Sequence, residues 1–77
     1  MDENNEFSIF CRNIYYLRVS NRLTQVQMAH KLGISIPSLR KLEHGILPPG
    51  LSCNVLFAIQ HNFGISIHSL FTPLHHF

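Results

Sequence analysis

Six histidines and two cysteines are the side chains of this 77-residue chain that most readily bind metals or act as nucleophiles. A zinc site needs three or four converging ligands, but His30, His44 and His61 fall in separate segments, and no two histidines stand four residues apart. Cys11 and Cys53 are too far apart in the sequence to form a zinc-binding pair. We interpret the histidines as solvated side chains and both cysteines as free, buried thiols.

Side chains suited to catalysis are also scarce. The chain has four acids, no glycine-rich phosphate loop, and no nucleophile at a recognisable spacing from a base. A chain this short leaves little room for a deep pocket. The sequence therefore predicts no enzyme, and no cofactor, metal or small-molecule substrate.

The lysines and arginines are the remaining side chains with binding chemistry. Asp2, Glu3 and Glu6 fall within the first six residues, so Glu43 is the one acid in the rest of the chain, against six cations. The formal net charge of +2 is therefore the sum of an acidic leader, residues 1–6, and a basic body that makes up the rest of the chain. We expect the leader to be flexible. A basic body suits a polyanion, although six cations are also what a solvated surface carries.

The elements that position these residues follow from apolar side chains at spacings of three and four, the period of amphipathic helices. Thr24 and Ser35 precede two of the helices as N-caps, and Gly33 and Gly45 follow them as stops. No segment alternates with period two, so we expect an all-α fold. The predicted helices cover residues 7–19, 25–32, 36–44 and 51–63, with a short fifth helix that follows a Ser66 cap and ends at 71.

A hydrophobic content of 45% suffices for one modest core, so we expect one domain over residues 7–73 and a short C-terminal tail over 74–77. No apolar run approaches the ~20 residues that span a bilayer, and the acidic, polar N-terminus is unlike a secretory signal. A cytoplasmic location is the default expectation.

Two amphipathic helices joined by the tight turn 33–35 form the most informative pattern in the chain. A short turn with glycine sets such helices at a steep angle. The second helix can then enter a DNA major groove, which is about 12 Å wide, while the first braces the backbone. The segment LTQVQMAHKLGISIPSLRKLEHG, residues 23–45, resembles the Cro/repressor-type helix-turn-helix family, also called the xenobiotic-response-element family, and the similarity extends from about 14 to 71.

This resemblance implies a compact five-helix bundle of the lambda-repressor-like type and a sequence-specific DNA-binding transcription regulator, a repressor, with double-stranded DNA as its partner. It also implies contacts to phosphates from the start of the second helix and to bases and phosphates from the third, the helix around 36–44. The candidate DNA-binding residues are Gln25, Ser35, Ile36, Pro37, Ser38, Arg40 and Lys41, with Arg22 beside them.

Other positions of the motif carry structural roles or depart from the family pattern. Arg18 and Glu43 match an ion pair that ties the first helix to the third. Arg22 stands where the family has glycine; we expect Asn21 to take the left-handed conformation, which leaves Arg22 free to approach a phosphate. Neither the side chain of Ile36 nor that of Pro37 can form a hydrogen bond with a base, but an apolar pair can contact a thymine methyl. The uncharged loop over residues 46–50 predicts few phosphate contacts.

Two further expectations concern partners. The alternative to a regulator is a helix-turn-helix module that binds a protein, or an antitoxin-like protein with weak DNA binding. The apolar tip Ile36–Pro37 and the tail residues Phe71, Leu74 and Phe77 favour it slightly. For the DNA-binding reading we expect a homodimer through the fifth helix and the tail, because paired recognition helices lie about 34 Å apart, one turn of DNA.

Overall fold

The computed structural model describes residues 5–74. Over that range the chain is all-α, as the sequence predicted, with no strand. The fifth predicted helix is a correction: it is a single 3-10 turn rather than an α-helix. The elements are α1 (Glu6–Ser20), α2 (Gln25–Leu32), α3 (Ile36–Glu43), α4 (Asn54–Phe63) and the 3-10 turn η1 (His68–Phe71).

The start of α1 is fixed by Asn5. Its side-chain Oδ1 accepts a hydrogen bond from the backbone N–H of Ser8 at 2.8 Å, which satisfies one of the free donors of the first turn. The helix therefore begins at Glu6, one residue before the predicted start. The first four residues of the predicted acidic leader lie outside the described residues.

The end of α1 corrects the sequence prediction for the turn that follows. Arg22, not Asn21, takes the left-handed conformation, with a φ of 57°. Its N–H donates to the carbonyl of Val19, and the N–H of Leu23 donates to the carbonyl of Arg18. This is the Schellman pattern, in which the residue after the C-cap is left-handed. Because Asn21 is the C-cap itself, with a φ of −95°, the glycine-like position falls on an arginine.

The helix-turn-helix segment follows its local signals closely. Thr24 caps α2 in a reciprocal capping box with Gln27. Gly33 ends α2 in the left-handed conformation, with a φ of 69°. Ser35 then caps α3 by accepting from the N–H of Ser38, and Pro37 lies within the first turn of α3, where it removes no helical hydrogen bond.

α4 begins three residues later than predicted. Its first residue is Asn54, whose N–H donates to Ser52 Oγ at 3.3 Å, and Cys53 occupies the N-cap without a side-chain hydrogen bond. The cause is the preceding loop, which runs through Pro49 and a left-handed Gly50. The predicted burial of Cys53 was wrong, because at the N-cap its side chain is exposed; Cys11 is buried as expected.

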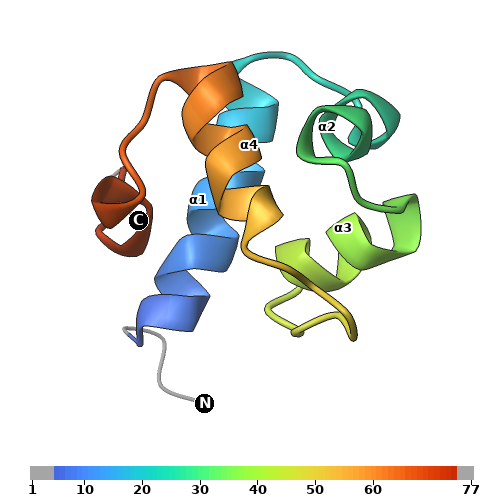
Figure 1. Ribbon diagram of the computed structural model, residues 1–77, viewed down its shortest axis with the longest axis horizontal. Coiled ribbons are helices and arrows are strands. Elements are labelled where there is room, and N and C mark those ends of the chain that lie inside the picture. The colour runs from blue at the N-terminus through green and yellow to red at the C-terminus, as the bar shows by residue number, and fades with distance from the viewer. Residues whose placement is uncertain (1–4, 75–77) are drawn as a thin grey trace.

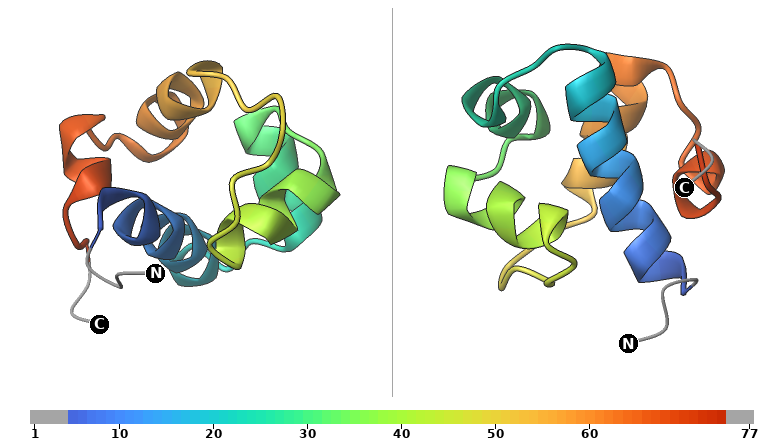
Figure 2. Two further views of the ribbon diagram at one scale, coloured as in Figure 1. Left: turned by 90° about the horizontal axis from the view of Figure 1, so that it is seen from below. Right: turned by 180° about the vertical axis from the view of Figure 1, so that it is seen from behind.

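The helices surround a shared core. α1 packs against α3 and η1, and α2 packs against α3 and α4. η1 lies beside α1 (Figure 1; Figure 2, left). The apolar residues buried in this core are Phe10, Cys11, Ile14, Leu17, Met28, Ala29, Leu32, Leu39, Leu42, Val55, Ile59 and Leu70.

One polar residue, Asn13, is completely buried in this core. Its Nδ2 donates to the carbonyls of Leu70 at 2.7 Å and Thr72 at 2.9 Å, and its Oδ1 accepts from the N–H of Leu74 at 3.1 Å. The ring of Phe71 also stacks on the ring of Phe10 in α1, with the two centroids 5.4 Å apart, which reinforces this attachment. The chain after α4 is thus fastened to α1 as far as Leu74, the first residue of the predicted tail; the last three residues lie outside the described range.

Candidate nucleic-acid interface

α3 presents one polar face to solvent. Leu39 and Leu42 are fully buried, whereas Pro37, Arg40 and Lys41 are exposed. Spacings of three and four place these exposed residues along one side of the helix. Two adjacent cations therefore occupy the middle of the outward face, without an acid beside them in the α3 sequence before Glu43.

His44 extends this face at the end of α3, and sequence reasoning assigned it no role there. It stands three residues after Lys41 and is exposed. Its Nδ1 lies 2.7 Å from the carbonyl of Arg40, so Nδ1 carries the proton in this contact, because a carbonyl only accepts. The helical spacing from Pro37 and Lys41 was the signal that would have included it.

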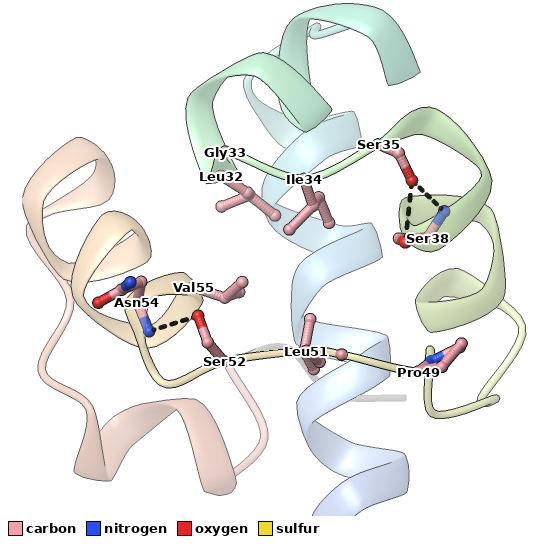
Figure 3. Close-up of a pocket in the computed structure, with 11 residues that line it drawn as sticks. Leu32, Gly33, Ile34, Ser35, Ser38, Pro49, Leu51, Ser52, Asn54 and Val55 are labelled. Atoms are coloured by element: carbon pink, nitrogen blue, oxygen red, sulfur yellow. Dashed lines mark hydrogen bonds between the residues drawn. The ribbon is translucent and has the colours of Figure 1, made fainter.

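The first turn of α3 is less open than the sequence predicted. Ser35 is exposed, but its hydroxyl lies 2.9 Å from that of the half-buried Ser38, so the two serines bond each other (Figure 3). Ile36 is half-buried and packs against the core. Pro37 projects an apolar ring from the same turn. This turn therefore offers few hydrogen-bonding groups that are not already engaged.

A cavity of about 270 Å³ lies between the turn before α3 and the loop before α4 (Figure 3). Its polar lining comes from Ser35, Ser38, Ser52 and Asn54, and Leu32, Ile34, Leu51 and Val55 supply apolar walls. None of the lining side chains is ionisable. The cavity therefore has no acid, base or metal ligand with which to perform chemistry.

Behind the exposed face, the structure brings Arg18 and Glu43 together. The Nε of Arg18 donates to Oε2 of Glu43 at 2.7 Å, and its Nη2 donates to Oε1 at 3.1 Å. The side chains are 17% and 4% exposed, so this two-point ion pair is largely shielded from water. The guanidinium also lies over the ring of Tyr15, 5.3 Å from its centroid. The pair ties α1 to the end of α3.

Gln25, the first residue of α2, reaches the same carboxylate. Its Nε2 donates to Oε1 of Glu43 at 3.3 Å, and its own Oε1 accepts from Nε of Arg40 at 3.2 Å. Sequence reasoning singled out each of these residues separately and missed the contacts among them. The partners lie 15 and 18 residues from Gln25, beyond the reach of any local pattern.

Arg22 lies apart from this group, exposed in the turn between α1 and α2. Over the described residues no group of three or more histidine, cysteine or acidic side chains is placed to hold a metal ion. Within residues 5–74 no helix is long and apolar enough to cross a membrane.

Comparison with known families identifies the family to which this fold belongs. The helix-turn-helix family model, of Cro/C1 type, matches residues 14–70, which is most of the chain. The chain belongs to this family of DNA-binding domains. The match covers α2, α3 and their connecting turn and extends to η1, as the resemblance in the sequence predicted. Comparison with the curated proteins found no match, and comparison with the solved structures found none either.

Proposed function

We propose that this protein is a sequence-specific transcription regulator, a repressor, that inserts α3 into the major groove of double-stranded DNA. The observation that carries the proposal is the exposed pair Arg40 and Lys41 on the outward face of the second helix of a helix-turn-helix. Both side chains donate only, which suits phosphate oxygens and the acceptor edge of guanine.

The other candidate residues take supporting places in this complex. The start of α3, Ser35 to Ser38, meets the base edges, with Pro37 and the exposed part of the half-buried Ile36 against thymine methyls. We expect Gln25, at the positive end of α2, to donate to a phosphate with the second proton of its Nε2, because the first is bonded to Glu43. Arg22 reaches a neighbouring phosphate from the turn before α2.

A second copy of the chain would double the number of bases read, so we propose a homodimer through residues 68–77. Leu70 is buried and Phe71 stacks on Phe10 within one chain. Over residues 68–74 the pairing surface must therefore use the sides that face away from Phe10 and the core. Sedimentation of the purified protein, with and without a palindromic duplex, tests this. As a DNA-binding regulator it would act in the cytoplasm.

Fluorescence anisotropy with a labelled random duplex across a salt series tests DNA binding. Log affinity should fall linearly with log salt, because bound cations release counterions from the phosphates. Lys41→Ala and Gln25→Ala should each weaken binding, but Lys41→Ala alone should reduce the slope by about one, because glutamine carries no charge. Lys31→Ala is the matched control, because Lys31 is an exposed cation on α2, away from α3. Equal losses in all three variants would refute the assignment of α3 as the reading helix.

A protein-binding module is the second candidate, and exposed apolar residues favour it. Ile46 and Leu47, directly after α3, are 54% and 64% exposed in a loop without charge, and Pro37 is exposed nearby in the sequence. This candidate predicts no measurable binding to any duplex at low salt.

A further inference from the structure

Four side chains form a continuous hydrogen-bonded chain that crosses three helices and ends on the proposed DNA-binding face. It runs from Arg18 on α1 to Glu43 on α3, then to Gln25 on α2, and returns to Arg40 on α3. Its inner end is shielded from water, with Glu43 4% exposed. Its outer end, Arg40, is exposed.

The chemistry of the two ends allows only one orientation of the amide between them. A carboxylate only accepts hydrogen bonds, so the Nε2 of Gln25 must face Glu43. A guanidinium only donates, so the Oε1 of Gln25 must face Arg40. An amide turned the other way would place oxygen against oxygen and nitrogen against nitrogen. The buried carboxylate therefore fixes which atom Gln25 shows to Arg40.

Gln25 therefore holds the guanidinium group of Arg40 by one edge. Its Nε is bonded to Gln25 at 3.2 Å, and over residues 5–74 no hydrogen bond is found for its two Nη groups. A free arginine side chain loses much rotational freedom when it binds, and a side chain that is already oriented loses less. The two Nη groups together match the spacing of two oxygens on a phosphate, or of O6 and N7 on guanine.

We propose that Glu43 is a positioning residue for DNA recognition, which acts through Gln25 to orient Arg40 toward DNA. This role rests on the proposed DNA-binding function and adds to the structural ion pair with Arg18. It makes Gln25 and Arg40 one coupled unit: removal of Gln25 also removes the orientation of Arg40.

A double-mutant cycle tests the coupling. The affinity for a random duplex is measured for wild type, Gln25→Met, Arg40→Met and the double variant; methionine keeps an unbranched side chain without hydrogen-bonding groups. We expect about tenfold loss for each single variant and only about ten- to twentyfold for the double, a coupling within the range found for residues in contact. The matched control pair is Gln25→Met with Lys41→Met, which should be additive, near a hundredfold. An additive Gln25–Arg40 cycle would overturn the proposal.

An NMR measurement without DNA separates this proposal from the DNA-binding function. The Nε–H signal of Arg40 should move toward that of a free arginine in Gln25→Met and in Glu43→Met, which removes the oxygen that accepts from Gln25. It should keep its position in Arg18→Met, which breaks the ion pair but leaves Gln25 bonded to Glu43. If the Arg40 signal is unchanged in folded Glu43→Met, the positioning role is refuted whatever the DNA affinity. If the signals change as expected but wild type binds no duplex at low salt, the proposed DNA-binding function is refuted. The role of Glu43 in DNA recognition is then refuted as well.

Discussion

Replacement of Asn13 should be among the most damaging single substitutions in the chain. Asn13 is fully buried, and its amide makes three hydrogen bonds to backbone groups of the segment after α4, at 2.7, 2.9 and 3.1 Å. Asn13→Ala removes all three at once. At roughly 1 kcal/mol of net stability per hydrogen bond, the loss is about 3 kcal/mol.

That loss is large for a domain of this size, whose total stability is expected to be roughly 4–12 kcal/mol. Thermal unfolding followed by circular dichroism should show Tm lowered by roughly 12–24 °C. Asn13→Asp should be at least as damaging at neutral pH, because a carboxylate cannot donate to the carbonyls of Leu70 and Thr72 and is desolvated in the core.

Asn62 supplies a matched control for this experiment. Its Nδ2 also donates to two backbone carbonyls, those of Ala58 at 2.8 Å and Lys31 at 3.2 Å, but the side chain is exposed. Water can replace both bonds, so Asn62→Ala should cost less than about 0.5 kcal/mol. If the two alanine variants unfold at the same temperature, the buried amide does not hold the C-terminal segment in the way argued.

Three further predictions concern single side chains. Arg18→Met leaves the buried carboxylate of Glu43 without its guanidinium and should cost about 3 kcal/mol in urea unfolding; the reasoning fails if a second change, Glu43→Met, restores none of it. Arg22→Gly should raise Tm by a few degrees, because glycine adopts the left-handed conformation without steric cost, and should lower the salt slope of DNA binding by about one; an unchanged Tm would argue against strain at this turn. Ellman's reagent should label the exposed Cys53 quickly and Cys11 only on unfolding, because burial raises the pKa of Cys11 to about 11; two equally fast thiols would contradict the burial of Cys11.

The helix-turn-helix was predictable because its signals are local. A cap, a stop and a second cap each act within three or four residues, as Thr24 does on Gln27 and Ser35 on Ser38. The apolar stripes of α2 and α3 lie between them, and both helices begin where the sequence predicted.

The sequence predictions were wrong or silent where the conformation or burial of a residue depends on more than its nearest neighbours in the chain. The left-handed residue after α1 is determined by where the last helical hydrogen bond forms. Here the hydrogen bonds that end the helix place Arg22, not Asn21, at that position. Burial of Asn13 runs against the rule that polar residues face water, and the partners that satisfy it lie 57 to 61 residues away. No local pattern contains that information.

The candidate site divides in the same way. Its members were proposed from the motif, but the contacts of Gln25 with Glu43 and Arg40 were not predicted. At the start of α3 the hydroxyl of Ser35 donates to that of Ser38 and Ile36 packs inward, so the hydroxyl proton of Ser38 is the side-chain donor that this turn keeps for a base. The charged donors lie one turn further along, on Arg40 and Lys41, and the first of these is held by Gln25. In the proposed complex, recognition therefore depends on two cations in the second turn, one of them oriented from the buried side of the helix.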